Sequence, residues 1–360
     1  MAIVRMETPS AIPPPPPSLL FLGSAVLVGA LACAWAVVSR RPRAPALQVR
    51  LPGVLLATGG SDRTPRLWDA DSGRLVHALE GHGETVTSVA VARGVCGRLL
   101  IASGSDDRSV RLWDADAGGP AVRTLPTGPR ARVLCVALEE SRAGVLVAAG
   151  CADHRARVWD GDSGRLLHTL RGHGAPVWGV ALHGGVVATG SGDHTARLWD
   201  AATGRLLHAL AGHSGWVVGV ALAQHQSRLV LATGSGDHTA CVWDAATGAR
   251  LHTLAGHRSW LRSVSLLSAG PRLLLATGAS DRTARVWDAL AGRLLRTLGG
   301  HRTHVRAVSL CAAGERLLVA TGDADHTARI FDLHTGELLS SWPGHAEDVF
   351  GVALHWDIQQ

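Results

Sequence analysis

The sequence contains no lysine, no asparagine and no tyrosine, so all 35 of its basic residues are arginine. Without asparagine the chain has no acceptor for N-linked glycosylation. The codons of the three missing amino acids are rich in A and T, and a GC-rich genome therefore explains their absence without any functional cause. The same bias means that the missing glycosylation acceptor says little about the compartment of the protein.

The six cysteines form no Cys-x-x-Cys pair, the spacing expected of a zinc or redox motif. Five of them fall in or beside short strand-like runs, namely Cys96, Cys135, Cys151, Cys241 and Cys311. This odd number predicts reduced, mostly buried thiols in a domain that faces the cytosol.

Excess positive charge is nearly absent from most of the chain, although the formal net charge is +6. Five of the 35 arginines and one of the 29 acidic residues lie in the first fifty residues, so residues 51–360 carry only +2. The basic surplus lies beside an apolar segment. This distribution argues against a nucleic-acid-binding protein.

The N-terminus predicts a membrane anchor. Residues 1–17 form a proline-rich tail, and the 21 residues Ser18–Val38 carry no charge, enough for a helix that crosses about 30 Å of hydrocarbon. A basic linker, 39–46, follows with Arg40, Arg41 and Arg43. The positive-inside rule then predicts a single-pass membrane protein whose C-terminal domain lies in the cytoplasm.

Two alternatives to the anchor remain open. Ala30-Leu31-Ala32 fits a signal-peptidase site, and a cleaved segment would make the protein secreted. A mispredicted N-terminus would leave a soluble cytoplasmic protein.

The rest of the chain is a repeat. A Trp-Asp pair recurs every 40–46 residues, with Phe331-Asp332 in the seventh place. Gly-His precedes most copies, the histidines being His82, His173, His213, His257, His301 and His345. We place the repeats at 47–78, 81–123, 128–169, 172–209, 212–253, 256–297 and 300–341, with a closing strand at 344–357.

One repeat shows the expected local structure. Val177–Leu182, Val186–Thr189, Thr195–Trp199 and Leu206–Leu210 are short β-rich runs separated by Gly- and Asp-rich turns. Four such strands make a small antiparallel sheet. One sheet cannot bury both of its faces alone, so the copies are expected to pack side by side and close into a ring.

These in-register copies resemble the WD-repeat family, which includes the β subunits of heterotrimeric G proteins. The resemblance covers about residues 47–357 and implies an all-β, seven-bladed propeller. It also implies that the last strand, Val349–Leu354, completes the first blade, which begins at Val54. Gln48–Leu51 is an alternative candidate for that strand.

Each copy has an Asp six residues before its Trp or Phe, and most have a Ser or Thr four residues before that Asp. The set looks like a hydrolase triad, but a catalytic triad is needed only once. The resemblance implies a structural hydrogen-bond network inside each blade. The complete sets are His345/Thr58/Asp62/Trp68, His82/Ser103/Asp107/Trp113, His173/Thr189/Asp193/Trp199, His213/Thr233/Asp237/Trp243 and His257/Thr277/Asp281/Trp287.

Two copies depart from this pattern. In the seventh, Phe331 lacks the indole donor of tryptophan. In the third, Gly128-Pro129 replaces Gly-His and Ala149 replaces Ser or Thr, so Asp153 is expected to lack partners. Histidines in separate blades cannot converge on one ion, so no metal and no cofactor are expected.

The resemblance places partner binding on the face formed by the loops into the first strand and the loops between the second and third. The residues after each Asp form a basic or titratable ring: Arg63, Arg108, His154, His194, His238, Arg282 and His326. Near the start of the first strand lie Trp178, Trp216, Trp260, Arg262, His304, Arg306, Asp348 and Phe350. Exposed Trp and Arg are typical of binding hot spots. The alternatives are that each Trp lies flat on a neighbouring blade and that a basic residue simply fits the turn.

The sequence therefore predicts a non-catalytic, membrane-tethered scaffold that binds proteins or peptides and no nucleic acid. A substrate receptor of a ubiquitin ligase is the alternative, although no copy carries Trp-Asp-x-Arg. A propeller enzyme is less favoured because no unrepeated cluster of carboxylates is found.

Overall fold

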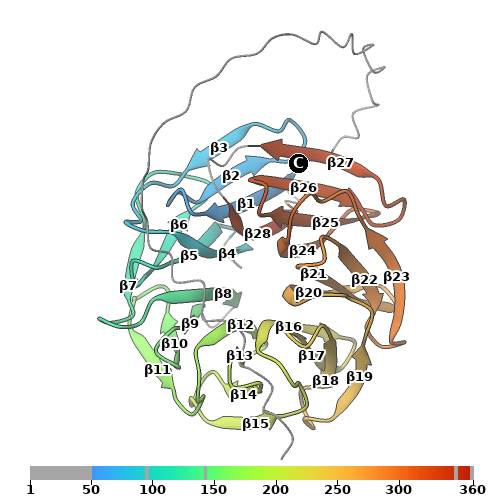
Figure 1. Ribbon diagram of the computed structural model, residues 1–360. Helices are drawn as coiled ribbons and strands as arrows, with labels where there is room; N and C mark the ends of the chain where they lie inside the picture. The colour runs from blue at the N-terminus through green and yellow to red at the C-terminus, as the bar shows by residue number, and fades with distance from the viewer. Residues whose placement is uncertain (1–50, 94–96, 142–143, 344–347, 357–360) are drawn as a thin grey trace, which may run out of the picture. The chain divides into compact units, whose positions relative to one another are not determined.

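The computed structural model describes residues 51–93, 97–141, 144–343 and 348–356. Within these residues, 28 strands form seven antiparallel sheets of four strands each. The sheets are arranged as blades around a common axis (Figure 1). The predicted all-β, seven-bladed propeller is confirmed.

Each blade runs from an inner strand near the axis to an outer strand at the rim. In this order the strands are β28 (Val349–Trp356), β1 (Val54–Gly60), β2 (Arg66–Asp69) and β3 (Leu75–Ala78) in blade 1; β4 (Val86–Arg93), β5 (Leu99–Ser105), β6 (Ser109–Asp114) and β7 (Arg123–Pro126) in blade 2; β8 (Val133–Ser141), β9 (Gly144–Cys151), β10 (Ala156–Asp160) and β11 (Leu166–Leu170) in blade 3; β12 (Val177–His183), β13 (Val186–Ser191), β14 (Ala196–Asp200) and β15 (Leu206–Leu210) in blade 4; β16 (Val217–His225), β17 (Arg228–Ser235), β18 (Ala240–Asp244) and β19 (Arg250–Leu254) in blade 5; β20 (Leu261–Ala269), β21 (Arg272–Ala279), β22 (Ala284–Asp288) and β23 (Arg293–Leu298) in blade 6; β24 (Val305–Ala313), β25 (Arg316–Asp323), β26 (Thr327–Asp332) and β27 (Leu338–Pro343) in blade 7.

The first blade combines the two ends of the domain. β28 pairs with β1, so that Leu56 lies opposite Leu354 and Thr58 opposite Val352. The inner strands contact one another in a closed circle, from β4 through β24 and β28 back to β4. Closure leaves no inner sheet edge exposed for pairing with another chain.

The hydrophobic core consists of clusters between neighbouring blades. Leu67 and Leu79 of blade 1 pack with Trp113 of blade 2. Val242 of blade 5 likewise packs with Trp287 of blade 6. The Trp of each Trp-Asp pair thus fills the space between its own sheet and the preceding one, which is why one blade could not stand alone.

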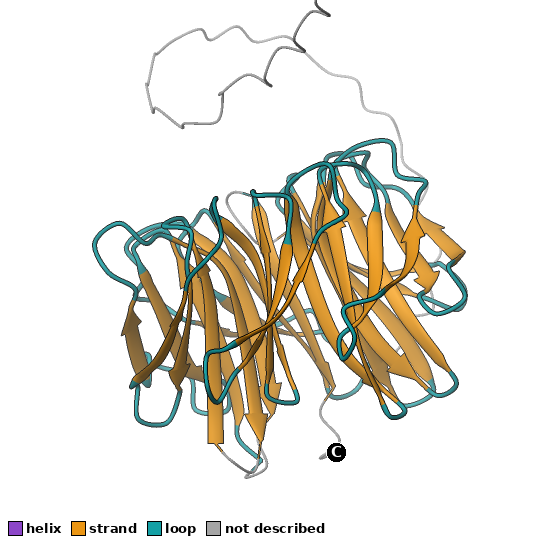
Figure 2. Cartoon of the chain, turned by 90° about the horizontal axis from the view of Figure 1, so that it is seen from below, coloured by secondary structure: helices purple, strands orange, loops and turns teal. Residues whose placement is uncertain are grey.

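The strands end in loops at the two ends of the propeller, as seen from the side (Figure 2). One end carries the loops into the inner strands together with those that join the second and third strands. This end is called the upper face below.

The proposed tail, anchor and linker at residues 1–17, 18–38 and 39–46 lie outside the described residues. In the described part of the chain, no helix is long and apolar enough to span a membrane. The membrane anchor stays a prediction.

Candidate functional site

A chain of hydrogen bonds crosses the interior of blade 2. His82 Nδ1 lies 2.7 Å from Asp107 Oδ2, and His82 Nε2 lies 2.7 Å from Ser103 Oγ. Trp113 Nε1 donates to the same Ser103 Oγ at 2.8 Å. An ionised carboxylate only accepts hydrogen bonds, so His82 Nδ1 donates to Asp107; in this tautomer of the neutral ring, Nε2 accepts the hydroxyl of Ser103. Each named polar atom is then satisfied.

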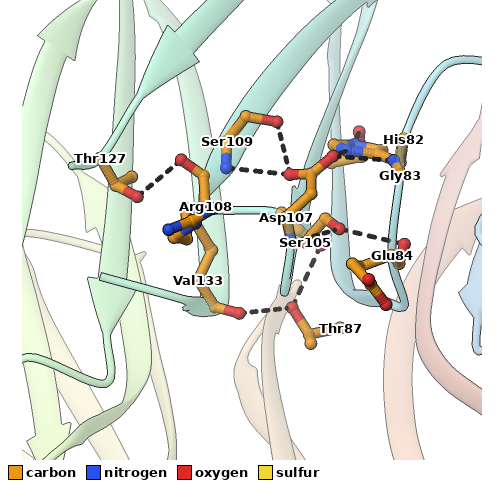
Figure 3. A network of polar contacts seen from close by, with 12 residues as sticks. His82, Gly83, Glu84, Thr87, Ser105, Asp107, Arg108, Ser109, Thr127 and Val133 are labelled. Carbon is orange, nitrogen blue, oxygen red and sulfur yellow. Dashed lines mark hydrogen bonds and ion pairs between the residues drawn. The ribbon is translucent and has the colours of Figure 1, made fainter. Parts of the chain in front are cut away.

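Asp107 accepts further hydrogen bonds from its own turn and from the loop that leads into β4 (Figure 3). Its carboxylate accepts the backbone N–H of Gly83 at 3.1 Å and the hydroxyl of Ser109 at 2.6 Å. Burial alone would raise the pKa of Asp107, but the hydrogen bonds from His82 and Ser109 hold it well below its ordinary value. The aspartate is ionised and fully engaged, so it has little capacity left for a ligand.

Blades 4, 5 and 6 repeat this arrangement with distances of 2.8–3.0 Å. The structure brings together His173, Thr189, Asp193 and Trp199; His213, Thr233, Asp237 and Trp243; and His257, Thr277, Asp281 and Trp287.

These sets cannot act as hydrolase triads. Each hydroxyl that would be the nucleophile is 0% exposed, at Ser103, Thr189, Thr233 and Thr277. A nucleophile must reach a substrate and an oxyanion hole. Burial also lowers the pKa of His173 and His257, as expected of rings enclosed within the blades. These hydrogen bonds instead join the loops and strands of one blade and make the blade rigid.

Blade 1 shows only part of its predicted set. Trp68 Nε1 donates to Thr58 Oγ1 at 2.8 Å, and Asp62 forms an ion pair with Arg66. His345, the predicted fourth member, lies outside the described residues.

In blade 3, the expectation that Asp153 lacks partners is wrong. Arg157 Nη1 lies 3.1 Å from Asp153 Oδ1, and Nη2 lies 2.6 Å from Oδ2. This bidentate pair replaces the hydrogen bond that the missing histidine would have donated to the aspartate. Arginine occupies the same strand position in most other copies, so its added role here could not be distinguished from the sequence.

The hydrogen-bond partners in blade 7 also differ from those in the other blades. His301 Nδ1 lies 2.8 Å from Asp323 Oδ2, and Asp325, the expected counterpart of the other aspartates, pairs with Arg329 instead. Asp323 stands where Ser191 and Ser235 stand in blades 4 and 5. Burial, reinforced by the positive charge of Arg329, lowers the pKa of His301 to about 4.

The ring of basic residues after each Asp shares one backbone conformation. The φ angles lie between 65° and 73° at Arg63, Arg108, His154, His194, His238, Arg282 and His326. Left-handed φ favours glycine and asparagine and tolerates histidine. Turn geometry therefore constrains these positions, whatever their side chains bind.

The three arginines of this ring are not close together. Arg108 Nη1 donates to Pro129 O at 2.9 Å beside an open cavity of about 720 Å³ between blades 2 and 3. Arg63 and Arg282 are exposed and form no ion pair with any described residue. Arg63 and Arg108 belong to blades 1 and 2, which do not neighbour the predicted tryptophans of blades 4–6.

Each inner strand has a β-bulge directly after its first core residue. Val177 lies opposite Ser191 and Gly179 opposite Gly190, so Trp178 has no partner in the register. The corresponding bulge residues are Thr87, Leu134, Val218, Arg262, Arg306 and Phe350. A bulge re-aims its side chain. Four residues of the predicted face occupy this bulge position: Trp178, Arg262, Arg306 and Phe350. The position has no characteristic residue type, so the bulge cannot be recognised from the sequence.

Three tryptophans form a continuous row across blades 4, 5 and 6. The rings of Trp178 and Trp216 stack with centroids 6.0 Å apart and planes 10° apart. Trp216 and Trp260 meet at 5.8 Å with planes 58° apart. Trp216 remains 42% exposed and Trp260 37% exposed, whereas Trp178 is half-buried. The rings cover one another and still present an aromatic surface to solvent.

Glycines in the neighbouring loops make room for this row. A Cβ added at Gly192 would lie 3.4 Å from Trp178 Nε1, and one at Gly236 would lie 3.7 Å from Trp260 Cδ2. Side chains larger than a methyl group at these positions would occupy the surface on which the indoles rest.

Ser280 organises the basic end of the row. Its Oγ accepts a hydrogen bond from Arg262 Nε at 2.8 Å, and its backbone N–H donates to Trp260 O at 2.8 Å. Its carbonyl oxygen lies 2.8 Å from His304 Nδ1. The Arg262 guanidinium lies 5.9 Å from the Trp260 ring centroid, within cation–π range. Sequence reasoning missed Ser280 because one serine in a turn carries no distinguishing pattern.

A second arginine continues the surface into blade 7. Arg306 Nη2 pairs with Asp348 Oδ2 at 2.6 Å, and its guanidinium lies 4.6 Å from the Phe350 ring centroid. His326 Nε2 lies 3.7 Å from Asp348 Oδ1. We call Trp178, Trp216, Trp260, Arg262, Arg306 and Phe350 the tryptophan–arginine face.

Across the described ranges, no group of three or more His, Cys, Asp or Glu side chains is placed to hold a metal ion. The four cysteines described there, Cys135, Cys151, Cys241 and Cys311, are free and buried.

Comparison with known families agrees with the geometry. The family model described as WD domain, G-beta repeat matches residues 73–114, 119–160, 164–200, 204–244, 248–288 and 292–332, more than half of the chain. Each window spans the outer strand of one blade and the first three strands of the next. The strands left over are β1 and β2 at one end and β27 and β28 at the other, so the seventh copy is divided between the chain ends.

Among solved structures, the chain is similar to the crystal structure of the computationally designed Ika8 protein. The two are 30% identical, with a TM-score of 0.61, over 82% of this chain and 86% of that one. No curated protein matches the chain.

Proposed function

The chain belongs to the WD-repeat family of β-propellers, and we propose that it is a non-catalytic scaffold that binds other proteins through the tryptophan–arginine face. One observation carries the proposal: Trp216 and Trp260 remain 42% and 37% exposed although both pack against another indole. A folded domain gains nothing from leaving such surfaces in water, whereas an interface gains most from aromatic and arginine anchors.

The repeated polar sets support a non-catalytic role. Their hydroxyls are buried and their aspartates are saturated with donors, as at Asp107 and Ser103. A ubiquitin-ligase substrate receptor is a narrower version of the same proposal. It receives no added support, because none of the Trp-Asp pairs is followed by x-Arg.

The test compares partner capture by the wild-type chain and by the double variant Trp216→Ala/Trp260→Ala. The matched control is Leu166→Ala/Leu206→Ala, which removes two side chains of similar exposure, 47% and 41%, from the outer strands. We expect specific partners to be lost only with the tryptophan variant. Equal capture by all three proteins, with equal thermal stability, would contradict the proposed face.

We also propose that residues 18–38 tether the propeller to a membrane, with the propeller in the cytoplasm. The support is the uncharged 21-residue stretch followed by Arg40, Arg41 and Arg43. Deleting residues 1–45 should move the protein from the carbonate-resistant membrane pellet to the soluble fraction. A deleted chain that still pellets would defeat the tether.

A further inference from the structure

Arg262 is a half-buried cation, and no described residue supplies a counter-charge for it. Its Nε atom donates to the Ser280 hydroxyl, a neutral group. No carboxylate of the described residues forms an ion pair with it, and its two Nη groups make no hydrogen bond to them. Burial, followed by repulsion from Arg306, lowers the pKa of Arg262. A partly desolvated charge of this kind lowers stability unless something else pairs with it.

The two neighbouring aspartates that the structure describes are already engaged. Asp348 pairs with Arg306, and Asp281 accepts hydrogen bonds from His257 and Thr283. On the same face, the exposed arginines Arg258, Arg282 and Arg302 form no ion pair with any described residue. This sector of the upper face therefore has positive charge that no described residue pairs with.

Aromatic surface lies directly beside that charge. The Arg262 guanidinium carbon is 5.9 Å from the centroid of Trp260, which in turn contacts Trp216. An apolar anchor and an anion-binding group thus lie side by side. An extended chain advances by about 3.3–3.6 Å per residue, so two adjacent residues of one segment can reach both groups. Among the three blades that carry the tryptophan row, only blade 6 has an arginine at the bulge position, because the bulge residue of blade 5 is Val218 and that of blade 4 is Trp178.

We propose that the tryptophan–arginine face binds an acidic protein segment in which an aromatic residue is adjacent to a glutamate or aspartate. The aromatic ring packs on Trp216 and Trp260, and the carboxylate accepts hydrogen bonds from the Nη groups of Arg262. The bond from Nε to Ser280 keeps the guanidinium plane oriented for two parallel hydrogen bonds to the carboxylate. This inference rests on the proposed function and specifies the chemistry of the partner.

The test uses three fluorescent peptides of one sequence, in which a central phenylalanine is flanked by glutamate, glutamine or lysine. Binding to the full-length chain in mild detergent is measured by fluorescence polarisation. We expect the glutamate peptide to bind at least about tenfold tighter than the other two, because a buried charge-assisted pair is lost when the carboxylate is removed. This comparison needs no variant.

Arg262→Gln should abolish the preference for glutamate, whereas Arg262→Lys should retain part of it, because lysine keeps the charge but not the bidentate geometry. Arg205→Gln, at an exposed arginine of blade 4 at the opposite end of the propeller, is the matched control and should change nothing. Trp216→Ala/Trp260→Ala should weaken all three peptides.

Tighter binding of the lysine peptide would overturn the inference, because the indoles would then be a site for cations. Equal binding of the glutamate and glutamine peptides, or a phosphoserine peptide that binds more than tenfold tighter than glutamate, would also overturn it. If partner capture depends on the tryptophans but not on Arg262, the proposed face survives and the acidic partner does not. If capture depends on neither, the proposed function itself fails.

Discussion

Ser280 Oγ lies 2.8 Å from Arg262 Nε, and this hydrogen bond joins the loop between β21 and β22 to the bulge of β20. The same serine is bonded through its backbone to Trp260 and His304. One small residue thus positions an aromatic, a cationic and a titratable side chain on the upper face. Ser280 itself does not contact the proposed ligand, and it acts by orienting the groups that do.

Replacing Ser280 with alanine should impair binding more than folding. The backbone bonds to Trp260 and His304 remain, so the free energy of unfolding should fall by about 1 kcal/mol or less. The affinity for an acidic peptide should drop several-fold, because Arg262 loses the bond that orients its guanidinium. Thermal unfolding and peptide titration measure the two effects. An unchanged affinity for the glutamate peptide would show that Ser280 does not orient Arg262.

The internal networks predict a contrast between two buried threonines. Thr189→Val removes the hydroxyl that His173 and Trp199 share and should cost about 2–4 kcal/mol, because two buried polar groups lose their partner. Thr321 in blade 7 is equally buried, but its hydroxyl has no hydrogen-bond partner within the described residues. Thr321→Val should therefore be nearly neutral. Denaturant unfolding of the two variants measures the contrast. Equal losses in the free energy of unfolding would mean that the shared hydroxyl of Thr189 does not stabilise blade 4.

Acid should weaken blade 6 through Asp281. Burial would raise the pKa of this carboxyl, but hydrogen bonds from Thr283, the Arg258 backbone and His257 lower it to about 2. A folded-state pKa below the unfolded value of about 3.9 stabilises the fold above pH 4, and this contribution is lost as pH falls from about 4 to 2. Asp281→Asn should be less stable than wild type at pH 6, and the difference should narrow toward pH 2. A difference that stays constant over this range would show that Asp281 is not ionised in the fold.

The left-handed turns predict opposite effects of two substitutions at Arg282. Its φ of 66° suits glycine, so Arg282→Gly should leave stability unchanged or raise it slightly. Arg282→Val should cost about 1–2 kcal/mol, because a β-branched side chain is strained there. Arg258→Val, at an exposed arginine without positive φ, is the control and should be nearly neutral. Equal effects of valine at both positions would count against a backbone constraint.

The ring of blades follows directly from the periodic Trp-Asp pairs, because each repeat needs its neighbour to bury its apolar side chains. What the repeats do not predict is the hydrogen bonding of the two blades in which a residue of the repeated pattern is replaced by one of different chemistry. Arg157 compensates for the missing histidine of blade 3, and Asp323 takes the partner that Asp325 was expected to have. Both substitutes are ordinary strand residues, and only the packed blade shows which atoms they reach.

The residues of the proposed face were named from the sequence, but the way in which the strands arrange them was not. Trp178, Arg262 and Phe350 come from different repeats, and the bulge that gives them a common position depends on strand register rather than on residue type. Ser280 escaped prediction for a similar reason, since its role depends on the neighbouring blade. Closure by β28 was expected from the family, and its register with β1 is now defined.

Photocrosslinking at the tryptophan row tests the central claim most directly. A benzoylphenylalanine placed at position 216 should form adducts with partner proteins in cells, because this side chain is at the centre of the proposed face. The same group at position 206, an outer-strand leucine of comparable exposure, should form few or none. Adducts at position 206 and none at position 216 would contradict the assignment of the binding face.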